Sequence, residues 1–440
     1  MNFIIVSLAA LAIIDFCSLD SRLGENVSVP SADFADFDLP VEESIAPEEN
    51  AFTYFMQASE ALKRFYTDEN GNSIELNKFV YENNTNLAVA AKILTENEQV
   101  FQLVRQGVEC RSCVLPKPES KDALTPYVLH ILSIGRLFST KIKYEKERGD
   151  IESALRSADD LLSFGSMIRQ NPNGFVSLVC AWAVEGMGIW RIQDLARDPR
   201  ISKQQLWCLL EMPDKTPPHY ASLQYAIKVE FALMAKYYES LPQIIKHRET
   251  FKSHFGTDSL LPYFIFRYHG FSPKLAKIES AESYRLLISD SAKFYADMTS
   301  FIEYDNIKRN FPDVFFEKNA IEKIIVSITS TTLTPLEMRC KHDANLAATK
   351  IIIASHLFQR ETGRRTQTLD ELVPDYLPYV PLDPFDGAPF RYNTELGVIY
   401  SVGQSLTDFG GVVESDDTVS DSNRTDPWRA KNAVFKIWEE

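Results

Sequence analysis

The chain of 440 residues has few cysteines and a deficit of positive charge. Its six cysteines are too few for a disulfide framework at this length, so a hydrophobic core must supply the stability. Lys and Arg number 46 against 61 Asp and Glu, and the resulting net charge of -15 opposes the approach of phosphate groups. We therefore expect no nucleic-acid partner.

The sequence also lacks the common signatures of enzymes. It contains no P-loop and no Gly-x-Ser-x-Gly motif, which removes the most frequent NTPase and hydrolase patterns. Its histidines show no His-Glu-x-x-His spacing, and we expect His247, His254 and His269 at the surface rather than on zinc. The residue pattern therefore identifies no reaction.

What the chain does have is a composition that can fold, with 45% hydrophobic and 12% aromatic residues. Helical spacing of apolar residues predicts an amphipathic helix from Pro47 to Tyr66. A second helix should begin near Thr125 and end at Gly149. Asp150 should cap a third, which stops before Asn171 and packs antiparallel to the second because the connection is so short.

The segment FVSLVCAWAVEGMGIWRIQDLAR, residues 175–197, is apolar on nearly every side and should form the central helix. Ser202 and Gln205 form a capping-box signal for the next helix. Further helical stretches run from Tyr220 to Tyr238, from Asn319 to Ser330 and from Asn345 to Gln359, while residues 241–313 give no clear pattern. We predict an α-helical domain over residues 45–340.

Two acidic residues stand among apolar neighbours in these helices. Glu185 lies near Trp182 and Met187 in the sequence, and Glu230 adjoins Phe231. A buried carboxylate must be paired or must shift its pKa, so each is either part of a structural ion pair or a catalytic acid. We favour the ion pair with Arg136 as partner; the alternative is a hydrolase that uses Glu185 and Glu230.

The N-terminal sequence predicts export. Residues Phe3 to Ile14 are apolar except for Ser7, a length that suits a signal sequence better than a membrane span. We expect a signal or membrane-anchor segment at residues 1–20 and an acidic linker at 21–44. No Lys or Arg precedes the apolar run, and a buried N-terminal helix is the alternative.

After Gly363 the chain changes character. The segments APFRYN and GVIYSVG predict two short strands with NTELG as the turn between them. A long helix that leads into a small antiparallel sheet is an α+β arrangement. We therefore predict a mainly α protein, with a multi-helix body followed by a small α+β module at residues 341–440.

The stretch RETGRRTQTLDELVPDYLPYVPLDPFDGAPFRY, followed by IYSVG and an acidic loop, resembles the C-terminal domain of the type II secretion major pseudopilins. Arg365 and Thr366 stand where that family has Tyr-Pro, and the chain has no prepilin-peptidase site. The whole chain is similar to a family of uncharacterised bacterial envelope proteins with an α-helical body and this tail. The resemblance implies a pseudopilin-like fold without a role as a pilin subunit.

The resemblance also implies a calcium-binding loop. Candidate oxygen ligands are Asp408, Asp416, Asp417 and Asp421, which surround the pair Gly410 and Gly411. A solvated acidic surface loop is the alternative, and we favour it because runs of charge usually face water. Calcium is thus a possible cofactor, and no other is expected.

The leading hypothesis is a non-enzymatic exported scaffold or interaction protein of the bacterial envelope. Its expected partner is another envelope protein, and the N-terminal segment gives a possible membrane anchorage. The rival hypothesis, the hydrolase, requires two carboxylates about 5 to 10 Å apart in an open cleft, whereas a structural pair would be enclosed and bonded to arginine.

Overall fold

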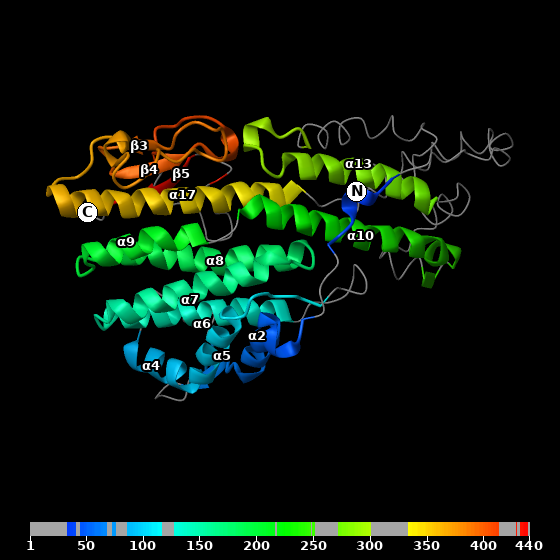
Figure 1. Ribbon diagram of the computed structural model, residues 1–440, viewed down its shortest axis with the longest axis horizontal. Helices are drawn as coiled ribbons and strands as arrows, with labels where there is room; N and C mark the ends of the chain where they lie inside the picture. The colour runs from blue at the N-terminus through cyan, green and yellow to red at the C-terminus, as the bar shows by residue number, and fades with distance from the viewer. Residues whose placement is uncertain are drawn as a thin grey trace.

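The computed structural model describes residues 33–40, 45–67, 73–75, 86–116, 127–215, 218–247, 249–250, 272–300, 333–412, 428 and 432–438. Within these ranges the protein is mainly helical, with a small three-stranded antiparallel sheet near the C-terminus, as predicted (Figure 1). The expected signal or anchor segment, residues 1–20, and the expected helix from Asn319 to Ser330 lie outside them.

The helices of the body follow one another along the chain. They are α2 (Ala51–Ala61), α4 (Leu87–Glu96), α5 (Glu98–Val108), α6 (Tyr127–Glu147), α7 (Ile151–Gln170), α8 (Phe175–Ala196), α9 (Lys203–Glu211), α10 (His219–Lys246), α13 (Pro273–Asp290) and α17 (Leu333–Thr362). The strands are β1 (Phe65–Thr67), β2 (Ser73–Glu75), β3 (Arg391–Asn393), β4 (Val398–Ser401) and β5 (Ala433–Lys436). Short 3-10 turns include η2 (Ala35–Phe37) and η3 (Pro47–Glu49).

Local signals in the sequence set several helix ends. The side chain of Asp150 accepts a hydrogen bond from the backbone N–H of Ser153, which caps α7 as expected. Ser202 and Gln205 form both bonds of the capping box of α9. Gly149 ends the turn between α6 and α7 at a φ of 79°, a conformation that favours glycine.

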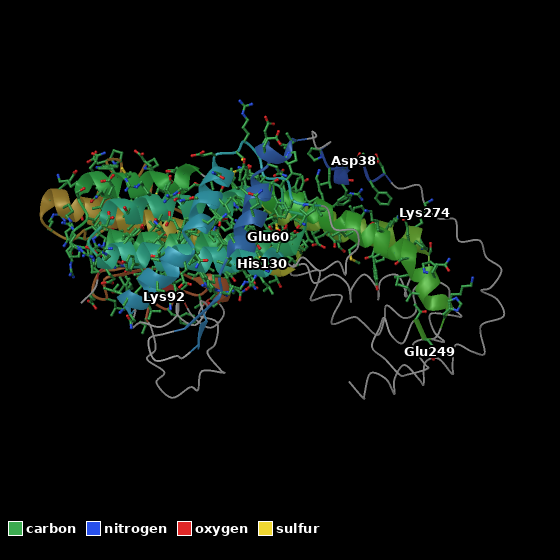
Figure 2. The ribbon with its side chains drawn as sticks, turned by 90° about the horizontal axis from the view of Figure 1, so that it is seen from below. Asp38, Glu60, Lys92, His130, Glu249 and Lys274 are labelled. Carbon is green, nitrogen blue, oxygen red and sulfur yellow. The ribbon has the colours of Figure 1, made fainter. Side chains whose placement is uncertain are left out.

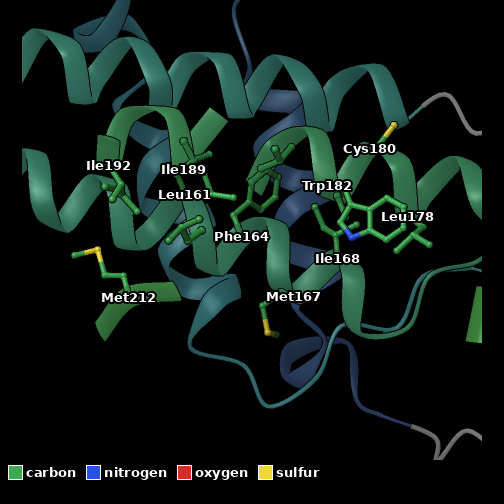
Figure 3. Close-up of a cluster of buried hydrophobic side chains, with 14 of the residues drawn as sticks. Leu161, Phe164, Met167, Ile168, Leu178, Cys180, Trp182, Ile189, Ile192 and Met212 are labelled. Carbon is green, nitrogen blue, oxygen red and sulfur yellow. The ribbon is translucent and has the colours of Figure 1, made fainter. Parts of the chain in front are cut away.

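Helix α8 lies at the centre of the body, as its all-round apolar composition predicted. It packs against α6, α7 and α17 (Figure 1). Figure 3 shows the buried cluster that α7 and α8 share, including Leu161, Phe164, Trp182 and Ile189. Among the described residues α8 is the one helix apolar and long enough to cross a membrane, but 61% of its apolar window is buried inside the protein. Its composition is thus that of a core helix.

Helices α10 and α13 pack against each other and extend beyond the rest of the body. Figure 2 shows their far end, where Glu249 and Lys274 lie well away from Glu60, Lys92 and His130. Residues 33–40, which lie within the expected linker at 21–44, dock on this pair of helices. The Phe37 ring is buried and stacks on Phe231 at 3.9 Å between ring centroids. Phe34 also contacts Phe231, and Asp36 forms an ion pair with Arg285 on α13.

The C-terminal sheet has the strand order β3-β4-β5. Its first two strands are those predicted, and Arg391 pairs with Tyr400 across them. Strand β5 was not predicted. It pairs with β4 so that Ile399 lies opposite Phe435, and all of β4 is buried as the middle strand.

Helix α17 joins this sheet to the helical body. It packs against α8 and α9 on one side and against β4 on the other (Figure 1). The expected domain boundary between residues 340 and 341 falls inside this single helix, so the chain has no break there. The module therefore shares its long helix with the core of the body.

Candidate functional site

Glu185 forms a buried ion pair, as expected, but its arginine is Arg169. The Arg169 Nε donates a hydrogen bond of 2.9 Å to Glu185 Oε1, and the two side chains are 1% and 2% exposed. A second N–H of Arg169 donates to Ser222 Oγ at 3.1 Å. The sequence named Arg136 as the partner of Glu185, whereas the arginine bonded to it here is Arg169. Arg169 comes from the neighbouring helix α7, which approaches α8 closely at Gly165.

The pKa of Glu185 shows that its charge is held in the core. Burial by itself would raise this pKa. The charge of Arg169 and the contacts with His342 and His219 outweigh burial and lower the pKa to about 2. Glu185 is therefore ionised at neutral pH.

Two histidines from other helices complete the cluster around Glu185. The Nε2 atom of His342, on α17, lies 3.1 Å from Glu185 Oε2, and the Nε2 atom of His219, at the start of α10, lies 3.8 Å from the same oxygen. Both histidine residues are 6% exposed, and their rings lie edge to face with centroids 4.5 Å apart. The cluster thus joins four helices, α7, α8, α10 and α17.

A second carboxylate holds His219 from the other side. The Nδ1 atom of His219 lies 2.5 Å from Asp343 Oδ1, while Arg339 Nη1 donates to Asp343 Oδ2 at 2.9 Å. Burial raises the pKa of Asp343, but His219 and Arg339 outweigh it and leave this pKa lowered. Burial, together with the charge of His342, lowers the pKa of His219 in spite of Asp343. We conclude that Asp343 is ionised and His219 neutral at neutral pH.

Several polar atoms at the centre of the cluster have no hydrogen-bond partner in the described part of the chain. They are Glu185 Oε2, His219 Nε2, His342 Nε2, Arg169 Nη2 and Trp182 Nε1. The 3.1 Å contact between His342 and Glu185 does not have the angles of a hydrogen bond. Each buried polar group without a hydrogen-bond partner lowers the stability of the folded state by about 1–3 kcal/mol. Native proteins therefore seldom have so many such groups in one place.

Glu230 has a different role from Glu185. Its Oε1 atom accepts a hydrogen bond of 2.8 Å from the backbone N–H of Phe175, the first residue of α8. Gly174 precedes that helix and has no side chain to cap it. Glu230 therefore caps α8 from a distance, where its negative charge also favours the helix N-terminus.

A groove of about 340 Å³ lies between α17 and the proline-rich segment before the sheet. Asp343 contributes to its wall, with a side chain 28% exposed. Tyr379 and Leu382, also in the lining, are 65% and 43% exposed. The remaining lining residues are Pro213, Leu346, Ala347, Lys350, Leu377, Pro378, Pro381 and Pro384. The opening segment of the module thus forms one wall of a mostly apolar groove.

The candidate calcium loop is described only at its start. Asp408 accepts a hydrogen bond of 2.8 Å from the backbone N–H of Gly410 and lies 3.3 Å from Arg391 Nε. The guanidinium of Arg391 also contacts Asp386 at 2.5 Å and Asp383 at 3.4 Å. A cationic side chain is thus already placed among these carboxylates. Asp416, Asp417 and Asp421 lie outside the described residues.

Sequence reasoning found Glu185 but missed Arg169, His219 and His342. The sequence does carry a signal for Arg169. This residue lies four positions after Gly165, on the apolar face of its helix, where an arginine needs an acidic partner. His342 and His219 carry no such signal, because no short spacing links residues from three separate helices. Of the histidines considered, His247 is exposed, as expected, and His254 and His269 fall outside the described ranges.

A scan against models of protein families, a search of curated proteins and a search of solved structures found no match to this chain.

Proposed function

We propose that the protein is a non-enzymatic scaffold, exported to the bacterial envelope, that binds a partner protein in the groove between α17 and the proline-rich segment. The observation that carries this proposal is the exposure of Tyr379 and Leu382 beside that groove. Large apolar side chains at the rim of a concave apolar surface are typical of binding sites. The apolar N-terminal run supports export.

The lining indicates what kind of partner fits. Four of its residues are prolines, which have no backbone N–H to donate to an added strand. Recognition therefore depends on side-chain packing, and we expect the partner to insert apolar side chains from an extended segment. Two charged residues also line the groove, Asp343 and Lys350, and Lys350 is paired with Asp214.

The geometry gives no support to the rival hydrolase. A carboxylate pair for glycoside hydrolysis lines an open cleft. Glu185 is instead 1% exposed and bonded to Arg169, while Glu230 is committed to the N-terminus of α8. An acid that is enclosed and bonded to arginine, as Glu185 is, fits a structural ion pair better than a catalytic carboxylate.

Site-specific photo-crosslinking in the native host tests the groove. A photoreactive phenylalanine in place of Tyr379 should give one adduct of defined size, and Leu382→Ser in the same chain should weaken it. The matched control is the same probe at Leu129, which is 66% exposed on α6. No adduct from position 379, or the same adduct from both positions, would reject the groove as the binding surface.

Cell fractionation tests export separately. We expect the protein in the envelope fraction or outside the cell. A wholly cytosolic pool would reject export, whatever the crosslinking shows.

A further inference from the structure

Three potential ligand atoms converge at the centre of the buried cluster. Glu185 Oε2, His219 Nε2 and His342 Nε2 belong to side chains whose candidate ligand atoms all lie within 4.8 Å of one another, and all three residues are buried. Each of these three atoms lacks a hydrogen-bond partner within the described residues. We propose that Glu185, His219 and His342 bind a divalent transition-metal ion of the zinc class.

The distances suit such an ion. Zinc binds histidine nitrogen and carboxylate oxygen at about 2.0–2.2 Å, and a tetrahedral arrangement then places neighbouring ligand atoms about 3.4 Å apart. The distances from Glu185 Oε2 to the two histidine Nε2 atoms are 3.1 Å and 3.8 Å, one on each side of that value. Shifts of a few tenths of an ångström would bring these two distances to that value, and a water molecule would be the fourth ligand.

The second carboxylate fixes the histidine tautomer that a metal needs. Arg339 donates to Asp343 Oδ2, and Asp343 Oδ1 lies 2.5 Å from His219 Nδ1, an arrangement in which the carboxylate accepts and Nδ1 donates. In that tautomer the Nε2 atom, 3.8 Å from Glu185 Oε2, keeps its lone pair for a metal ion. A carboxylate on the far nitrogen of a histidine is the usual support for a metal ligand.

This tautomer leaves two electron-rich atoms facing each other. Neither the lone pair of His219 Nε2 nor the carboxylate oxygen of Glu185 can donate a hydrogen bond to the other. A cation between them removes the repulsion. The cation could be a proton on His342, which would then donate to Glu185, or a metal ion bound to all three atoms.

The geometry favours the metal over the proton. A proton on His342 would satisfy one nitrogen, but the His342 ring is not aligned for a hydrogen bond to Glu185, and His219 Nε2 would remain without a partner. A metal ion satisfies all three atoms at once. Glu185 can bind it through Oε2 while Oε1 keeps its bond to Arg169.

Direct metal binding by the full chain tests the proposal. Protein stripped with a chelator should take up one zinc ion per chain and melt at a higher temperature with zinc present. Cobalt in its place should give the intense visible absorption of a tetrahedral site. Uptake should fall as the pH drops, because the histidines must be unprotonated.

Matched variants assign the ligands. His342→Gln should abolish stoichiometric zinc binding, Asp343→Asn should weaken it about 10–100-fold as an outer-shell change does, and His247→Gln, at an exposed histidine, should leave it unchanged. Circular dichroism establishes that each variant is folded. The proposal is overturned if the folded native chain takes up no zinc or cobalt, which would identify the cation as a proton, or if His342→Gln and His247→Gln bind zinc alike. Should His342→Gln not fold, the native chain's uptake and cobalt spectrum decide alone.

Discussion

Arg169 on α7 and Glu185 on α8 form a hydrogen-bonded ion pair of 2.9 Å in the interior, with both side chains at most 2% exposed. The attraction within a buried ion pair little more than offsets the free energy of removing both charges from water. Removal of one partner, however, strongly destabilises the fold because it leaves an unpaired buried charge. The pair therefore sets how α7 and α8 face each other more than it adds to stability.

Single and double substitutions of this pair should be strongly non-additive. We expect Arg169→Met and Glu185→Leu each to lower the free energy of unfolding by about 3–5 kcal/mol, because each leaves an uncompensated buried charge. The double variant should lose much less than the sum, since neither charge remains. Urea unfolding of all four proteins, each stripped of metal with a chelator, measures the coupling. Strictly additive losses would show that the two charges do not depend on each other.

Two glycines provide a matched test of helix packing. A Cβ at Gly165 would lie 2.6 Å from Glu185 Cγ and 3.0 Å from the Glu185 backbone nitrogen, whereas a Cβ at Gly186 would meet nothing within 4 Å. Gly165→Ala should destabilise the protein by about 1–3 kcal/mol through overpacking. Gly186→Ala should stabilise it by up to about 1 kcal/mol, because alanine favours the helix. Thermal melts that showed both variants alike would contradict the close crossing of α7 and α8.

His356 should make the attachment of the C-terminal module sensitive to acid. Its Nε2 atom lies 3.0 Å from the carbonyl oxygen of Ile437 and must donate to it, and the ring lies edge to face with Trp438. Burial lowers the pKa of His356 to about 4, from an ordinary value near 6.5. Below pH 6.5 the unfolded chain therefore binds this proton before the folded chain does.

The free energy of unfolding should fall by about 3 kcal/mol from this residue alone as the pH drops from 6.5 to 4. His356→Gln should lose that part of the pH dependence, while His247→Gln, at an exposed histidine, should keep it. Urea unfolding at pH 7, 5.5 and 4 gives the comparison. The same slope in His356→Gln and the native chain would rule out His356 as the titrating group.

The acidic loop should not depend on calcium. Arg391 already lies 3.3 Å from Asp408 and 2.5 Å from Asp386, so its guanidinium supplies the cation that clustered carboxylates require. We expect millimolar calcium or a chelator to leave the melting temperature unchanged, and Arg391→Gln to cost about 1.5–3 kcal/mol through lost charged hydrogen bonds. A rise with calcium that Asp408→Asn abolishes would instead support the metal site implied by the pseudopilin resemblance.

The sequence alone determined the parts of this protein that depend on neighbouring residues in the chain. Asp150 caps α7 and Ser202 with Gln205 caps α9, because these bonds join residues only three apart. The apolar composition of residues 175–197 made α8 the core helix, and the short segments APFRYN and GVIYSVG on either side of NTELG formed β3 and β4. Strand β5 escaped prediction because its order comes from pairing with β4 rather than from a pattern of its own.

Only the tertiary structure decided which charged groups meet. The sequence showed that Glu185 would be buried and would need a partner, but it could not choose Arg169 over Arg136, since each lies on a helix beside α8. His219 and His342 reach the same carboxylate from α10 and α17, which are far apart in the chain. The rotation and crossing of packed helices place these three side chains together, and those depend on the fit of whole helix surfaces rather than on any local spacing.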